Sequence, residues 1–168
     1  EVIERLNTLN NSIIALTACF SFSFAMFFKL GVFPFHSWLC DVYDGSVITI
    51  TAFFSAIPKL ILLSFFIKVT FIVFVGYNEI FSQLLLYAGL LSICFASLAA
   101  LYQKRIKRLM AYSTISHSGF LILGVSCFTI DSVKACIFYI VVYIAMTLCL
   151  FGVLFLSSTN NKQKYLIN

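Results

Sequence analysis

Three ionisable side chains lie inside long apolar stretches of the sequence: Lys29, Lys59 and His117. A charged side chain at the centre of a membrane-spanning helix costs roughly 2.5–3.5 kcal/mol, and such residues usually mark an ion or proton path. Lysine and histidine both bind and release protons, so these three are candidates for a proton relay. Two other interpretations stay open: a lysine that extends to the membrane surface, and a neutral histidine hydrogen-bonded between helices.

Both lysines lie beside residues that distort helices. Lys29 is followed by Gly31 and Pro34, and Lys59 directly follows Pro58. Breaks in the helix are expected at such residues. Non-helical backbone at membrane depth is tolerated only where protein or a water-filled cavity satisfies it, and in transporters such breaks line the ion site. An ordinary proline kink is the alternative at Pro58.

His117 has polar neighbours, among them Tyr112 and Ser113. Ser113 precedes His117 by four residues and would share its helical face, so its hydroxyl could bond the ring or hold a water molecule. A proton relay needs such surroundings, but so does a hydrogen-bonded polar patch with no role in transport.

No carboxylate is available to pair with the two lysines inside the apolar stretches. The acidic residues all lie outside the span centres: Glu1, Glu4, Asp41, Asp44, Glu79 and Asp131. Either the lysines are neutral, or the counter-charge comes from another chain. For Lys29 we expect a carboxylate on a separate polypeptide, with Asp41 and Asp44 as poorer partners.

The composition determines the elements that must position these residues. Of 168 residues, 62% are hydrophobic and 10% charged, whereas soluble domains have about 45–50% and about 25%. A soluble domain of this size cannot bury so much apolar surface. With roughly 20 residues needed for each span, the sequence predicts an all-α integral membrane protein, a single transmembrane domain over residues 1–168.

Five spans are predicted, the first of them broken near Gly31–Pro34. The basic run at 104–108 predicts a loop on the cytoplasmic or mitochondrial matrix side. The Asp44 loop and the polar tail should lie on that side, and the loops at 78–79 and 131 on the other. The predicted spans are 12–43 (broken), 47–74, 80–101, 109–128 and 133–156, followed by the tail 157–168.

Several functional classes lack their signatures. The six cysteines form no C-x-x-C pair, and there is no nucleotide-binding loop, haem ligand pair or iron–sulfur cysteine set. The net charge of +5 comes from scattered residues apart from the run at 104–108, which is not the pattern of a nucleic-acid-binding protein. We therefore expect lipids and other membrane proteins as partners, and neither a metal nor a redox centre in this chain.

Three stretches resemble one family. Residues 28–45 read FKLGVFPFHSWLCDVYDG, residues 51–59 read TAFFSAIPK, and residues 103–120 read QKRIKRLMAYSTISHSGF. In order and spacing, from about residue 22 to 124, they resemble the antiporter-like subunit 2 of respiratory complex I, called subunit N in bacteria. The remainder resembles that family only in hydropathy. Cys40 stands where the family usually has proline.

The resemblance implies roles for the candidate residues. Lys29 would be the lysine of the broken helix, Lys59 the central relay lysine, and His117 the histidine of the helix after the basic loop. The supporting residues would be His36, Tyr112, Ser113, Pro34 and Pro58. The fold would be part of a paired five-helix inverted repeat.

The resemblance also implies an activity. The chain would be a proton-translocating membrane-arm subunit of NADH:ubiquinone oxidoreductase, in the mitochondrial inner membrane or the bacterial plasma membrane. NADH, FMN, iron–sulfur clusters and ubiquinone would be bound elsewhere in that complex.

Parts of the family pattern are absent: the earlier helix with its glutamate and the later broken helix with its terminal lysine. This implies an internal or split portion of the subunit, whose flanking helices come from a separate chain. The alternatives are a stand-alone cation/proton antiporter, and a structural assembly subunit that no longer pumps.

Overall fold

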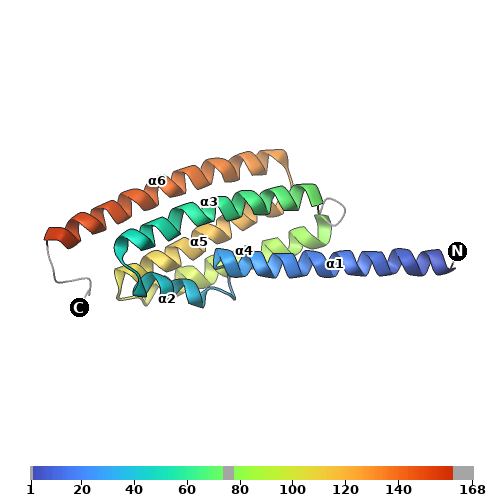
Figure 1. Cartoon of the computed structure of the whole chain (residues 1–168), viewed down its shortest axis with the longest axis horizontal. Helices are drawn as coiled ribbons and strands as arrows, with labels where there is room; N and C mark the ends of the chain where they lie inside the picture. The colour runs from blue at the N-terminus through green and yellow to red at the C-terminus, as the bar shows by residue number, and fades with distance from the viewer. Residues whose placement is uncertain (1, 74–77, 161–168) are drawn as a thin grey trace.

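A computed structural model of the chain describes residues 2–73 and 78–160, and this part is helical throughout apart from short turns. The predicted all-α membrane fold is thereby confirmed (Figure 1). The helices are α1 (Val2–Leu30), α2 (Ser37–Gly45), α3 (Ile48–Val73), α4 (Asn78–Leu101), α5 (Ile106–Ser126) and α6 (Ile130–Asn160).

The predicted break in the first span lies between α1 and α2. Gly31 has a φ of 70°; its N–H donates to the Phe28 carbonyl (3.2 Å), and the Val32 N–H donates to the Phe27 carbonyl (2.9 Å). This pair of hydrogen bonds is the Schellman motif, in which glycine adopts the left-handed conformation that ends a helix. The chain then turns, and α2 begins at Ser37.

The expected break at Pro58 is not present. Pro58 lies inside α3, which continues from Ile48 to Val73. Proline removes only one backbone hydrogen bond, and membrane helices tolerate it where neighbouring helices hold the segment. Lys59 therefore projects from a continuous helix, and only Lys29 lies at a helix end.

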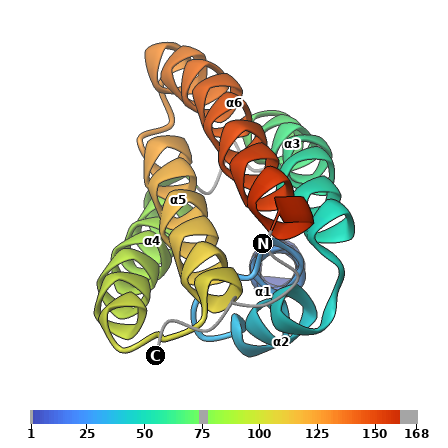
Figure 2. The ribbon, with the colours of Figure 1, turned by 90° about the vertical axis from the view of Figure 1, so that its left-hand side faces the viewer.

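Helices α3 to α6 run antiparallel to one another in sequence order (Figure 1). Viewed from the α2 end, α5 lies between α4 and α6, α3 lies beyond α6, and α1 and α2 lie below (Figure 2). Helices α4 and α5 pack closely, because a Cβ added at Gly119 would lie 2.9 Å from the Gly89 carbonyl oxygen. Small residues allow membrane helices to approach in this way.

Four helices are long and apolar enough to cross a membrane: Ile48–Ile72, Glu79–Leu101, Ile106–Ser126 and Ile130–Ser157. They overlap the last four predicted spans. The predicted span 12–43 corresponds to α1, the turn and α2, and Leu16–Leu30 is an apolar segment within the described part of α1. Most of the predicted tail, including Lys162 and Lys164, falls outside the described residues.

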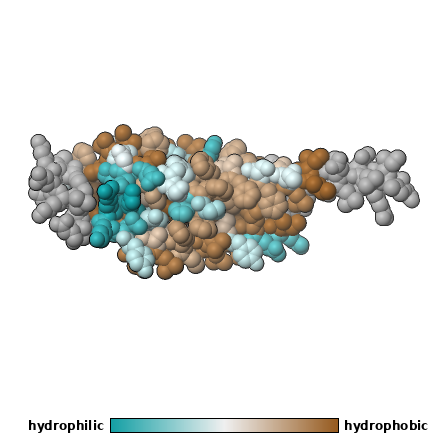
Figure 3. All heavy atoms as spheres, turned by 90° about the horizontal axis from the view of Figure 1, so that it is seen from below, coloured by the Kyte–Doolittle hydropathy of each residue, from teal (hydrophilic) through white to brown (hydrophobic). Residues whose placement is uncertain are grey.

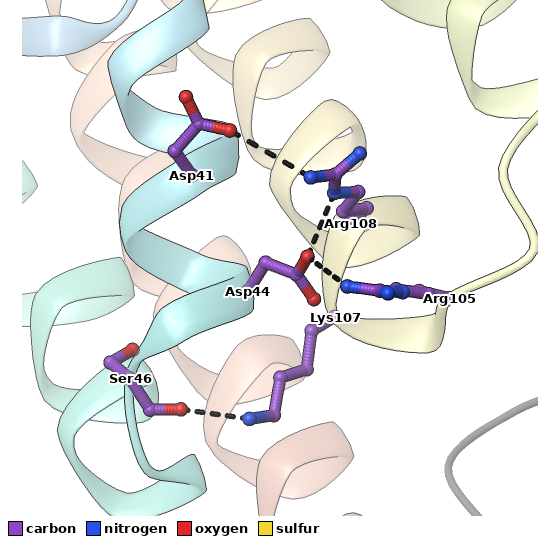
Figure 4. A network of polar contacts seen from close by, with 6 residues as sticks. All are labelled: Asp41, Asp44, Ser46, Arg105, Lys107 and Arg108. Carbon is purple, nitrogen blue, oxygen red and sulfur yellow. Dashed lines mark hydrogen bonds and ion pairs between the residues drawn. The ribbon is translucent and has the colours of Figure 1, made fainter.

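One end of the bundle is polar. The Asp44 carboxylate pairs with Arg105 (2.6 Å) and Arg108 (3.0 Å), and Arg108 also lies 3.8 Å from Asp41. Lys107 donates to the Ser46 carbonyl (2.8 Å) (Figure 4). The loop after α2 and the basic loop before α5 thus lie together, as predicted. Hydrophilic residues gather at this end, and hydrophobic ones cover most of the bundle beyond it (Figure 3).

Candidate functional site

Lys59 is buried where α3, α5 and α6 meet. Its side chain is 6% exposed. The ammonium donates to the Thr114 carbonyl (2.9 Å) and to the Ser118 hydroxyl (2.6 Å) on α5, and it lies 5.8 Å from the centroid of the Tyr143 ring on α6. In the described part of the chain no carboxylate forms an ion pair with it. The site therefore holds the ammonium by neutral acceptors and an aromatic face.

Two polar rows with helical spacing bring these groups together. On α3 the row is Thr51, Ser55 and Lys59, and on α5 it is Thr114 and Ser118; all five are buried. Residues four apart share one face of a helix, so each row forms a polar stripe on an otherwise apolar helix. Thr114 and Ser118 lie close to His117 in sequence, but the four-residue spacing of both stripes is the signal that they face Lys59.

The end of α1 also contributes to the Lys59 site. The Ser118 hydroxyl, which accepts from Lys59, lies 2.9 Å from the Thr114 carbonyl oxygen and 3.4 Å from the Leu30 carbonyl oxygen. Carbonyls in the last turn of a helix lack intrahelical partners and carry the partial negative charge of its C-terminus. The break after Leu30 thus places negative partial charge beside the buried lysine.

Lys29 is not part of this cluster. It is exposed on the surface of the chain, whereas Met26, Phe27 and Leu30 occupy the buried face of α1. Among the described residues, its ammonium has no hydrogen bond or ion pair. This chain alone therefore does not bring Lys29 into the polar cluster around Lys59, and the relay role of Lys29 stays a prediction.

His117 faces α6. Its Nδ1 lies 2.7 Å from the Tyr139 hydroxyl, and its ring centroid lies 5.0 Å from that of Tyr143. Tyr139, and not the expected Ser113, holds the ring. Ser113 is on the same helix, but the imidazole reaches across to the neighbouring one.

Tyr143 lies between Lys59 and His117. It is 3% exposed, and its hydroxyl donates to the Ser55 carbonyl (3.3 Å) with the Thr114 hydroxyl at 3.4 Å. Lys59, Tyr143 and His117 thus form a row across α3, α6 and α5. Sequence reasoning did not identify Tyr139 or Tyr143, because nothing close in sequence connects α6 to the candidate residues.

The remaining supporting residues form a separate group near α2. The His36 ring centroid lies 4.5 Å from that of Phe95 and 6.4 Å from that of Tyr112, and Pro34 is exposed. These contacts do not extend to Lys59. They lie around the turn between α1 and α2. The protein provides a hydrogen-bond partner for the backbone of this turn, because the Phe33 N–H donates to the Ser92 hydroxyl (3.1 Å).

Comparison with known proteins gives consistent results. The transmembrane family model described as NADH:quinone oxidoreductase/Mrp antiporter matches residues 1–168. The chain is similar to NADH-ubiquinone oxidoreductase chain 2 of Marchantia polymorpha, at 38% identity over 139 residues, covering 83% of this chain and 28% of that protein. It is also similar to NADH-quinone oxidoreductase subunit N of Ruthia magnifica, at 39% identity over 84% of this chain and 28% of that protein.

A solved structure shares the fold. In the Mrp complex from a Dietzia species, a chain matches 76% of this chain with a TM-score of 0.72 and 24% identity, over 24% of its own length. The family match extends beyond the 22–124 region in which the motifs lie. The chain spans little more than a quarter of the length of the two curated relatives.

Proposed function

This chain belongs to the NADH:quinone oxidoreductase/Mrp antiporter transmembrane family, and we propose that it is a proton-translocating membrane-arm part of an NADH:ubiquinone oxidoreductase. The observation that carries the proposal is the burial of Lys59 among hydroxyl, carbonyl and tyrosine groups. A buried lysine held in this way can accept and release a proton. The membrane would be the mitochondrial inner membrane or a bacterial plasma membrane.

The geometry supports a simple division of roles. Lys59 would hold the proton, with its ammonium stabilised by the Thr114 carbonyl, the Ser118 hydroxyl and the face of the Tyr143 ring. His117 would be the next acceptor, with Tyr139 fixing its Nδ1. Tyr143, in contact with both, would position the groups between them. We propose that the electron-transfer chemistry, with NADH, FMN, iron–sulfur clusters and ubiquinone, takes place in other subunits.

Lys29 has a different proposed role. A lysine on the outer face of an apolar helix is costly in lipid, and removing one partner of a buried ion pair typically costs about 3–5 kcal/mol. We therefore propose that a glutamate from a separate polypeptide packs against α1 and pairs with Lys29. In a structure of the whole complex, a carboxylate within about 4–6 Å of the ammonium is expected, the range over which an opposite charge acts strongly.

Other partners would cover the apolar surface. Side chains of α3 and α6 line an open groove, among them Phe53, Ile57, Leu60, Ile144 and Leu148. We propose that lipids and neighbouring membrane subunits cover this face, because the side chains that line it are apolar.

A stand-alone cation/proton antiporter is the second candidate, favoured by the shared fold of the Mrp complex chain. Two features favour the first candidate: identity to the oxidoreductase relatives is higher, and the sequence contains no mid-span carboxylate. A structural subunit that no longer pumps would keep the fold but have no need of a buried lysine.

The test replaces Lys59 with methionine in the complete complex, reconstituted in vesicles. NADH-driven proton uptake per NADH oxidised should fall while the complex still assembles. Lys68→Met is the matched control, because Lys68 is on the same helix but exposed. An assembled Lys59→Met complex that pumps as the wild type does would refute the relay. Cation-driven proton exchange by the chain without NADH would favour the antiporter.

A further inference from the structure

The surface of α4 that points away from the bundle carries a strip of polar side chains. Helix α4 lies at the edge of the bundle (Figure 2), and Gly89, Ser92 and Ala96 on its inward face are buried. The exposed residues at alternating four- and three-residue spacing, which we call the outer strip, are Gln83, Tyr87, Leu90, Cys94 and Ser97. With 3.6 residues per turn, the outer strip lies opposite the buried face.

Two members of the outer strip expose hydrogen-bonding groups within a membrane-spanning helix. Tyr87 is 64% exposed and lies close to the middle of the span Glu79–Leu101. Within residues 2–73 and 78–160, neither the Tyr87 hydroxyl nor the Gln83 amide has a hydrogen-bond partner. A polar group placed in an apolar environment without such a partner is costly, so both groups need a partner in the membrane.

Lipid does not supply these partners. From Gln83 to Ser97 the outer strip rises about 21 Å at 1.5 Å per residue, and the hydrocarbon core of a bilayer is about 30 Å thick. Headgroups therefore reach only the ends of the strip, and Tyr87 lies between them. By contrast, none of the exposed side chains of α6 between residues 137 and 156 carries nitrogen or oxygen, which is the composition that hydrocarbon favours.

A membrane-spanning helix supplies what lipid does not. Alternating three- and four-residue spacing is the pattern by which two helices pack along their length, and polar side chains hydrogen-bond across the interfaces of membrane helices. Leu90, 46% exposed at the centre of the outer strip, provides an apolar contact between the polar positions. The outer strip thus has the chemistry of a helix interface.

The strip continues to a charge at the membrane boundary. Glu79 precedes Gln83 by four residues and is exposed on the same face of α4. Among the described residues its carboxylate has no ion-pair partner. Charge complementarity therefore requires a lysine or arginine of the partner helix at this end.

We propose that the outer strip of α4 binds a membrane-spanning helix of a neighbouring subunit. Polar uncharged side chains of that helix hydrogen-bond to Tyr87 and Gln83, and a lysine or arginine at its boundary pairs with Glu79. The inference rests on the proposed function in one respect, because it takes the partner helix from the membrane arm of that complex.

The first test is Tyr87→Phe in the complete complex, with Tyr102→Phe as the matched control, because Tyr102 is an exposed tyrosine just beyond the end of α4. Native gel electrophoresis measures how much of this chain leaves the complex as detergent is added. Tyr87→Phe and Gln83→Leu should each increase the release several-fold over wild type. A strip that faces lipid would gain from the loss of a polar group, so release that is unchanged or lower in both variants would overturn the interface.

Salt tests the charged end of the strip. Added salt should increase release of the wild-type chain, because it screens exposed charges, and Glu79→Gln should reduce this dependence on salt. Asp131→Asn is the control, because Asp131 is an exposed carboxylate at the same end of the bundle (Figure 1) that already pairs with Lys134. A salt dependence that Glu79→Gln leaves unchanged would refute the proposed ion pair.

Cryo-electron microscopy of the wild-type complex gives a readout that does not depend on the variants. Helix density with a side-chain nitrogen or oxygen within hydrogen-bond distance of Tyr87 Oη is expected. Acyl-chain density along the outer strip instead would overturn the interface, even if the variants failed to assemble.

The outcomes separate the two proposals. Wild-type release in Tyr87→Phe and Gln83→Leu, with pumping lost in Lys59→Met, would overturn the interface and leave the proposed function standing. Normal pumping by an assembled Lys59→Met complex, with increased release in Tyr87→Phe, would refute the relay and leave the interface standing.

Discussion

Lys59 on α3 and Ser118 on α5 lie 2.6 Å apart, ammonium nitrogen to hydroxyl oxygen. The same hydroxyl lies 3.4 Å from the carbonyl oxygen of Leu30, the last residue of α1. The broken first span therefore acts on the lysine of another helix, while its own Lys29 faces outward. Gly31 matters because it ends α1 where that carbonyl reaches the Lys59 site.

Ser118→Ala should destabilise the protein. The substitution removes one of the two hydrogen-bond acceptors of a buried ammonium, and hydrogen bonds to charged groups contribute about 1.5–3 kcal/mol. The unfolding temperature of the purified complex should fall, and proton uptake should fall with it. Ser64→Ala is the control, because Ser64 is exposed and bonds only within its own helix. Equal behaviour of the two variants would contradict the importance of the Lys59–Ser118 contact.

Gly119→Ala should loosen the packing of α4 on α5. The new Cβ would lie 2.9 Å from the Gly89 carbonyl oxygen, which is backbone and cannot move aside as a flexible side chain can. Overpacking of this kind typically costs about 1–3 kcal/mol. Thermal unfolding measures the loss. Gly152→Ala is the matched control, since a Cβ there meets nothing within 4 Å and alanine favours a helix more than glycine does. A loss of the same size in both variants would contradict the contact with Gly89 as the cause.

How much of the site the sequence predicts depends on the kind of signal. A lysine within an apolar run and a Gly31–Pro34 pair are local features, so the broken span and the candidacy of Lys59 could be read directly. The outward direction of Lys29 could not, because in a membrane the lipid-facing and protein-facing residues are both apolar. Only polar stripes such as Ser55–Lys59 reveal the inner face of a helix.

Contacts between helices are the other limit. Four-residue spacing made Ser113 a candidate partner of His117, and spacing within a helix cannot show that Tyr139, 22 residues later, contacts the ring. In contrast, the contact between Asp44 and the basic loop follows from topology alone. The chain crosses the membrane an even number of times between these two loops, so both lie at the same end of the bundle.

Asp44→Asn should weaken the attachment of α2 to α5. Asp44 pairs with Arg105 and Arg108, and since these side chains are partly exposed the loss should be about 1 kcal/mol, at the upper end for such pairs. The difference from wild type in thermal unfolding should shrink as salt is added, because salt screens exposed charges. Asp131→Asn, which removes the exposed pair with Lys134, should have almost no effect. A salt-independent loss at Asp44 would argue against an electrostatic attachment.

The basic loop should face the cytoplasm or the mitochondrial matrix. Lys104→Cys should react with a membrane-impermeant thiol reagent added on that side. Native Cys127 marks the opposite side, because it is exposed and directly follows α5, a helix long enough to cross the membrane. Reaction of both cysteines from one side would overturn the arrangement.

Tyr139→Phe should impair transfer through His117 without removing the histidine. The Tyr139 hydroxyl lies 2.7 Å from Nδ1, and a hydrogen bond at one ring nitrogen sets which nitrogen carries the proton. Without it the imidazole is free to rotate and to change tautomer, so proton uptake by the reconstituted complex should fall and its pH profile should shift. Tyr102→Phe is again the control, since it removes the same atom from an exposed ring. The effect should be absent when His117 is already replaced by glutamine, because both substitutions act on one ring; additive losses in the double variant would mean that Tyr139 contributes by some route other than His117.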